Sequence, residues 1–112
     1  LKPQEGDIVL NKYKYSAFYG TNLDILLNNQ GIDTMLISGV CTEACCFSTA
    51  RDAGFREMNI GFLADLNGTI DFPDLGYGAM TAQEMHNAML CNIALTTAHV
   101  MESEYALELM DK

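Results

Sequence analysis

The chain has few positive charges, few prolines and no long apolar run. Six lysine and arginine residues stand against fifteen acidic ones, which gives a net charge of −9 and leaves no basic stripe for a nucleic acid. No apolar run approaches the roughly 18 residues that a membrane helix needs. With only two prolines, the sequence also has no proline-rich linker or other biased tract. We therefore expect residues 1–112 to be one globular domain whose partners include neither nucleic acid nor a membrane.

The sequence also has no cysteine spacing typical of a structural zinc site. It contains no Cys-x-x-Cys pair, and neither His86 nor His99 stands at zinc-finger spacing from a cysteine. Reduced thiols in a cytoplasmic protein, with no metal and no cofactor, are the better interpretation. The four thiols are Cys41, Cys45, Cys46 and Cys91.

Apolar periodicity predicts strands that alternate with helices. Strands are expected at 7–11, 34–38, 58–65 and 99–101, and helices at 21–29, 42–53 and 81–96 and from Ser103 onward, with Thr21, Thr42, Thr81 and Ser103 as their N-caps. This alternation predicts an α/β fold, a three-layer α/β/α sandwich around a mainly parallel, Rossmann-like sheet. Because the first seven residues read as a loop that enters a strand, we expect N-terminal strands of the domain to precede Leu1.

The most informative stretch is the junction between the expected strand at 34–38 and the helix that follows it. Thr42 stands where an N-cap is needed, and Cys45 follows in the first helical turn. Free backbone N–H groups and the helix dipole there stabilise a thiolate, so Cys45 is the candidate nucleophile. Cys46 lies on another side of the same helix and is expected in the core, Cys41 is of interest for its backbone N–H, and Cys91 is expected to be structural.

Other candidates are weaker when judged on local pattern alone. Lys12 follows the expected strand at 7–11, where it is either a solvated surface charge or a partner for the thiolate. Asp65 ends the expected strand at 58–65 and is an even choice between a structural and a functional carboxylate. The aromatic loop that follows Lys12 leaves two options open, an apolar ligand pocket or simple loop packing, for Tyr13, Tyr15, Phe18 and Tyr19.

Two sequence blocks together resemble the isochorismatase-like cysteine hydrolases, the superfamily of nicotinamidases, N-carbamoylsarcosine amidohydrolases, and ureidoacrylate and biuret hydrolases. The segment 12–23, KYKYSAFYGTNL, resembles the family's Lys-x-Arg-Tyr-Ser-Ala-Phe-x-Gly-Thr-x-Leu block. The segment 39–53, GVCTEACCFSTARDA, resembles its nucleophile block. The two blocks stand at the family's usual separation, and the resemblance extends over nearly the whole chain.

The resemblance implies a role for each residue that matches these blocks. Cys45 would be the nucleophile and Lys12 the catalytic lysine. The bond between Val40 and Cys41 would be the family's non-proline cis peptide, which directs the N–H of Cys41, together with that of Cys45, at the oxyanion of the intermediate. Tyr15, Phe18 and Tyr19 would bind the substrate. The family's catalytic aspartate and the metal ligands of nicotinamidases would lie before Leu1, so no metal site is expected within residues 1–112.

These residues predict a cysteine-dependent amidohydrolase that cleaves a C–N bond of a small amide or carbamoyl substrate through a thioester. Cys45 favours this reaction over the vinyl-ether hydrolysis of isochorismatases proper, which lack the cysteine. We expect the isolated chain to have little or no amidase activity and to form homo-oligomers. Two alternatives remain open, an inactive remnant that serves as a binding or oligomerisation module, and a thiol redox sensor that uses Cys45 and Cys46.

Overall fold

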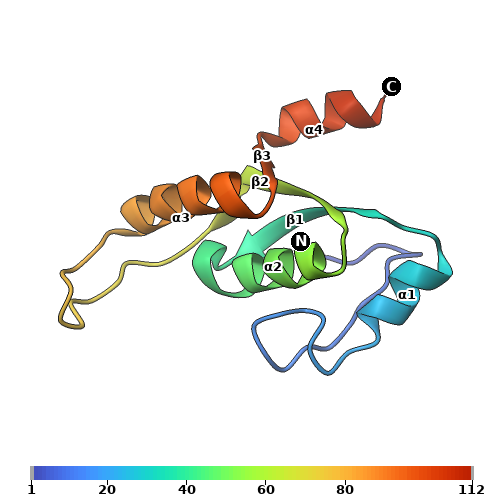
Figure 1. Ribbon diagram of the computed structural model, residues 1–112, viewed down its shortest axis with the longest axis horizontal. Helices are drawn as coiled ribbons and strands as arrows, with labels where there is room; N and C mark the ends of the chain where they lie inside the picture. The colour runs from blue at the N-terminus through green and yellow to red at the C-terminus, as the bar shows by residue number, and fades with distance from the viewer. Residues whose placement is uncertain (1, 112) are drawn as a thin grey trace.

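Three parallel strands form the centre of the molecule (Figure 1). The computed structural model describes residues 2–111. Strand β1 (Thr34–Val40) pairs with β2 (Asn59–Gly68), and β2 pairs with β3 (His99–Met101), so the sheet order is β1-β2-β3. Because consecutive strands run parallel and a helix lies in each connection, the chain has the expected α/β fold with a parallel sheet.

The helices lie at the ends of the strands and on the faces of the sheet. The strand β1 leads into a π-helical turn, η1 (Thr42–Cys46), which continues directly as α2 (Phe47–Phe55). The remaining helices are α1 (Leu23–Asn29), α3 (Ala82–Thr96) and α4 (Ser103–Met110). The longest of these, α3, has 15 residues, and within residues 2–111 no helix is both long enough and apolar enough to cross a membrane.

Alternate residues of β2 point to opposite faces of the sheet, and both faces carry helices. Ile60 and Phe62 are buried in one core cluster with Ala50 of α2 and Ile93 of α3. On the other face Gly61 lies among side chains of β1, β3 and α4. A Cβ on Gly61 would come within 2.6 Å of the end of the Leu36 side chain, so a larger residue there would require Leu36 to move.

The local expectations differ from the structure at several places. Residues 7–11 are extended but form no strand, because they make no ladder with any described strand, and Ile8 and Val9 remain exposed. The strand β2 continues to Gly68, past the expected end at 65. The N-caps of α1 and α4 are Asn22 and Glu102 rather than Thr21 and Ser103, while Thr81 caps α3 as expected, in a full capping box with Glu84.

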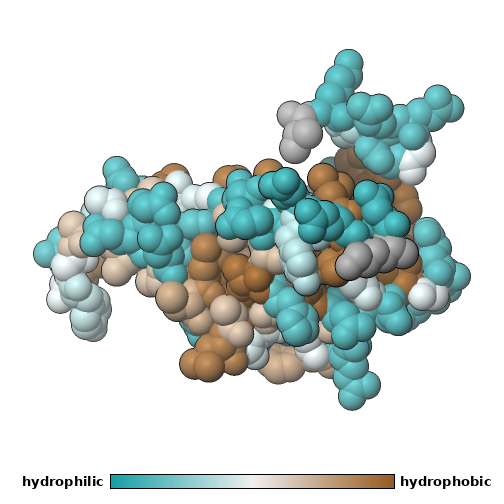
Figure 2. Space-filling view, turned by 90° about the horizontal axis from the view of Figure 1, so that it is seen from above, coloured by the Kyte–Doolittle hydropathy of each residue, from teal (hydrophilic) through white to brown (hydrophobic). Residues whose placement is uncertain are grey.

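The connection from β2 to α3 extends away from the sheet, at the left of Figure 1. Its two arms meet through an antiparallel bridge between Phe72 and Met80, and Tyr77 near its tip is fully exposed. Figure 2 shows the molecule from above, with hydrophobic patches between hydrophilic side chains. Apolar side chains are thus exposed outside the core as well as packed within it, among them Phe55 and Leu95.

Candidate active site at the end of β1

Cys45 lies in the π-helical turn η1, which connects β1 to α2. The peptide bond between Val40 and Cys41 is cis, as the family resemblance implies. The carbonyl of Cys41 accepts hydrogen bonds from the amides of Ala44 (3.1 Å) and Cys46 (3.2 Å), which lie on either side of the Cys45 amide. This π-type spacing, rather than the regular i→i+4 spacing, is the local reason that the chain turns wide at the nucleophile.

Lys12 is brought to this turn from a distant part of the sequence. Its Nζ donates to Cys45 Sγ at 3.5 Å, although the two residues are 33 positions apart. At this distance the ammonium group can stabilise negative charge that develops beside it during a reaction. The structure therefore combines the two features that an activated sulfur nucleophile needs, a partly exposed cysteine and an adjacent cation.

The neighbouring Cys46 has the opposite environment. Its side chain is 5% exposed and belongs to the core cluster, as the sequence analysis expects. Burial, with the nearby thiols of Cys45 and Cys41 as further causes, raises the pKa of Cys46 to about 11. The thiol of Cys46 is therefore protonated at neutral pH, and this disfavours a redox pair between Cys45 and Cys46.

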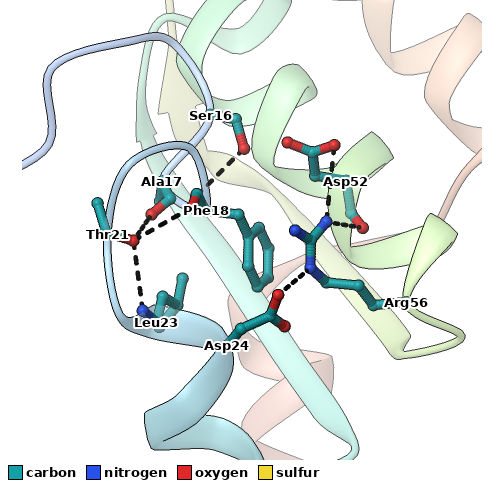
Figure 3. Close-up of polar contacts among 8 residues, drawn as sticks. All are labelled: Ser16, Ala17, Phe18, Thr21, Leu23, Asp24, Asp52 and Arg56. Atoms are coloured by element: carbon teal, nitrogen blue, oxygen red, sulfur yellow. Dashed lines mark hydrogen bonds and ion pairs between the residues drawn. The ribbon is translucent and has the colours of Figure 1, made fainter.

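Contacts of Arg56, the C-cap of α2, fasten the segment that follows Lys12, which comprises the loop and the first turn of α1 (Figure 3). The guanidinium of Arg56 pairs with Asp24 at 2.7 Å and also donates to the Asp52 carbonyl at 3.1 Å. The same guanidinium lies over the Phe18 ring, 4.4 Å from its centroid. A second attachment is the bond from the Ala17 amide to the Thr49 hydroxyl at 2.9 Å. These contacts hold the loop against the helix that begins at the nucleophile.

Two cavities open beside Lys12. One is lined mainly by the end of β1, and the other by the aromatic loop. One, of about 360 Å³, includes Cys45 and the residues Ile37 to Val40. The other, of about 770 Å³, is lined by tyrosines and by polar residues of α2. Tyr15 and Tyr19 line this second cavity. Phe18 is 5% exposed and packs in the core beneath Arg56, so it stabilises the loop from within.

Several other candidates lie away from Cys45 or have structural partners. Asp65 accepts hydrogen bonds from the hydroxyl and the amide of Ser103, at 2.6 and 2.8 Å, and these bonds lower the pKa of Asp65. It therefore fixes the start of α4. Cys91 is exposed, which contradicts the expectation of a packed, structural thiol, because its position on α3 faces away from the sheet. His99 is an exposed residue of β3.

The sequence analysis missed the role of Thr42. Instead of capping a helix, Thr42 is the first residue of η1, it is fully buried, and its hydroxyl lies 2.7 Å from Nδ1 of His86. A hydroxyl next to a glycine-containing turn gives no local signal that its partner lies 44 residues away. Among residues 2–111, no three histidine, cysteine, aspartate or glutamate side chains come together closely enough to hold a metal ion.

The sequence of the chain is similar to that of known proteins. The family model of the isochorismatase domain matches residues 1–105. The ureidoacrylate amidohydrolase RutB of Methylorubrum extorquens is 38% identical over 104 residues, which are 93% of this chain and 42% of the relative. The chain thus spans less than half the length of this relative.

Solved structures agree with the sequence comparison. A cysteine hydrolase from Pseudomonas syringae pv. phaseolicola superposes with a TM-score of 0.93 at 34% identity, over 96% of this chain and 50% of that one. An isochorismatase-like hydrolase from Alkaliphilus metalliredigens gives a TM-score of 0.85 at 29% identity, over 98% and 54%. With a family model that matches residues 1–105 and a parallel α/β fold shared with these neighbours, the chain belongs to the isochorismatase family.

Proposed function

We propose that this chain carries the nucleophile of a cysteine-dependent amidohydrolase that acts on a small amide or carbamoyl substrate. The observation that supports the proposal most directly is the 3.5 Å contact between Lys12 Nζ and Cys45 Sγ at the mouth of a cavity. The amidohydrolase named among the relatives supports the choice of a C–N bond as the bond that is cleaved. In this role Lys12 stabilises the thiolate and then the charge of the intermediate.

The proposed reaction proceeds in two stages. The Cys45 thiolate attacks the carbonyl carbon, a C–S bond forms, and the carbonyl electrons move to the oxygen. The amides of Cys41 and Cys45 donate to this oxyanion, and one such donor is worth roughly 3–4 kcal/mol of barrier. Collapse of the intermediate breaks the C–N bond and releases the amine, which takes up the proton that the thiol lost. Water then hydrolyses the thioester and regenerates the thiol.

Proton transfer needs a group besides Cys45 and Lys12. The resemblance matches no residue of this chain to the family's catalytic aspartate, and we propose that the 112 residues supply the nucleophile, the cation and the oxyanion donors. A missing general acid–base group costs typically about 10²–10⁴-fold. We therefore expect the isolated chain to turn over amides slowly if at all, and to react with activated esters, whose leaving groups need no proton.

The acyl-enzyme can be trapped with p-nitrophenyl acetate. We expect intact-mass spectrometry to show one added acetyl group, and peptide mapping to place it on Cys45. Cys45→Ala should abolish the addition. Cys91→Ala is the matched control, because this thiol is exposed but lies on α3, and it should leave the acetylation of Cys45 unchanged. Acetylation spread evenly over the exposed thiols, or none at all, would contradict the proposal and favour a binding or oligomerisation module.

The setting of the protein is part of the same proposal. We propose a cytoplasmic protein, because all four cysteines are free thiols. We also propose self-association, because large apolar side chains remain exposed on several elements, Phe55, Leu95 and Tyr105 among them. Light scattering after size-exclusion chromatography should show a particle larger than one chain, and a strictly monomeric particle would contradict this part.

A further inference from the structure

His86 bridges three elements that meet behind the nucleophile turn. Its Nδ1 lies 2.7 Å from the Thr42 hydroxyl of η1, and its Nε2 lies 3.0 Å from the Ala64 carbonyl of β2. The imidazole itself extends from α3 and is half-buried. A single side chain therefore joins the turn, the central strand β2 and a helix.

The partners of the two ring nitrogens determine which tautomer of His86 fits the site. The Ala64 carbonyl can only accept, so Nε2 must carry a proton and donate to it. In the neutral imidazole Nδ1 is then a hydrogen-bond acceptor, and the Thr42 hydroxyl donates a hydrogen bond to it. If both nitrogens carried protons, the hydroxyl of the fully buried Thr42 would lose its acceptor, and an unsatisfied buried donor is costly.

Thr42 is the residue through which this bridge reaches the reaction centre. It follows Cys41 directly and begins the turn that ends at Cys45 and Cys46. The two amides proposed to bind the oxyanion, those of Cys41 and Cys45, thus lie on either side of a buried side chain that His86 holds by a 2.7 Å bond. Sub-ångström placement of such donors decides how strongly they stabilise an oxyanion.

We propose that His86 is a positioning residue which, through Thr42, holds the amides of Cys41 and Cys45 in the geometry that stabilises the oxyanion. This inference rests on the proposed function, since it assigns a task within that active site. His86 lines neither of the two cavities beside Lys12, and it acts through the backbone of the turn. Its effect should therefore appear in reactions that form an oxyanion and be absent from reactions that do not.

Two isosteric variants separate the two bonds of His86. An asparagine oxygen stands near the position of Nδ1 and can accept from Thr42, whereas a glutamine amide reaches the position of Nε2 and can only replace the donor to Ala64. Acylation by p-nitrophenyl acetate passes through an oxyanion, but alkylation by iodoacetamide does not. We expect His86→Gln to slow acylation of Cys45 about 100-fold, as for the loss of one oxyanion donor, with alkylation changed less than about twofold.

Two further measurements test whether His86 acts through Thr42: the acylation rate of His86→Asn, and that of a double variant at Thr42 and His86. His86→Asn should restore most of the acylation rate, and Thr42→Val should reproduce the His86→Gln defect without adding to it in the double variant. Equal acylation rates in the wild type and His86→Gln would overturn the proposal. A parallel loss of acylation and alkylation in both His86 variants would also overturn it, because this pattern indicates a purely structural role.

An amide NMR spectrum decides the question without any catalysis. His86→Gln should shift the Cys41 and Cys45 amide signals, while His86→Asn leaves them near their wild-type positions. Unmoved signals in His86→Gln would overturn the positioning role. If the wild-type chain is not acylated at all, the proposed function fails, but the amide signals still report whether His86 holds the turn, so the two failures are distinguishable.

Discussion

The two sides of the turn after β1 differ sharply, although consecutive residues form them. On one side Cys45 meets Lys12 at the edge of a cavity, and on the other Cys46 is packed among apolar side chains of the core. Because the two residues are consecutive in a helical turn, the backbone directs their side chains to different sides of it. The same atom type is thus set up as a nucleophile on one side and as a small apolar side chain on the other. The difference teaches that the surroundings of a thiol, more than its position in the sequence, decide its chemistry.

The buried environment of Cys46 depends on the packing of the core, which a core substitution should disrupt. Phe62→Ala removes a fully buried ring that packs in the same cluster as Cys46. We expect the free energy of unfolding to fall by about 3–5 kcal/mol, because a cavity remains where the ring was. Urea unfolding followed by circular dichroism measures this loss. Tyr15→Ala on the exposed loop is the control, and an equal loss there would show that the two sides are not distinct.

The cavity side depends on the charge of Lys12. Lys12→Met keeps a chain of similar length without the ammonium, and we expect acylation of Cys45 by p-nitrophenyl acetate to slow by about ten- to a hundredfold, because the charge of the intermediate loses a nearby cation. Lys14→Met, in the same loop, is the matched control and should change the rate less than about twofold. Similar rates in both variants and the wild type would mean that the contact at 3.5 Å does not stabilise the charge of the intermediate.

Because the pKa of Cys46 is raised in the folded protein, the buried side of the turn should make stability depend on pH. An unfolded thiol releases its proton near the ordinary value of 9.0, whereas the folded thiol keeps it up to about 11. The contribution of the protonated thiol to stability is complete below pH 9.0 and is lost as the pH rises towards about 11, and its size is roughly 3 kcal/mol. Unfolding measured at several pH values should show a shallower decline in Cys46→Ala than in the wild type. Identical slopes would show that the site is not desolvated.

The smallest expected effect concerns the contact that joins the Lys12 loop to α2. Arg56→Gln removes the ion pair with Asp24 and the stacking on Phe18, and we expect a loss of about 1 kcal/mol in stability. Limited proteolysis should then cut the loop 12–22 faster. Arg51→Gln is the control, because Arg51 stacks on Phe47 of its own helix and does not touch the loop. Faster cleavage in both variants would point to general loosening.

Much of the fold could be predicted because the patterns that encode it are local. The apolar run at 34–38 and the helical spacing of 82–96 need only their own residues to indicate a strand and a helix, and both are present. The expected strand at 7–11 is absent because a strand is completed by hydrogen bonds to a neighbour, which the apolar pattern of one segment does not show. The apolar neighbours of Cys91 in sequence predict a buried thiol, but its side chain lies on the exposed side of α3.

By itself the sequence determined where the nucleophile lies: a β-prone run, a small-residue turn and a helix start place Cys45 at a strand end through backbone preferences of adjacent residues. Only the tertiary structure decided which side chains meet there. Lys12 and Cys45 are separated by 33 residues, and Thr42 and His86 by 44. Such pairs form when the packing of whole strands and helices brings distant segments together, and short-range conformational preferences carry no record of that packing.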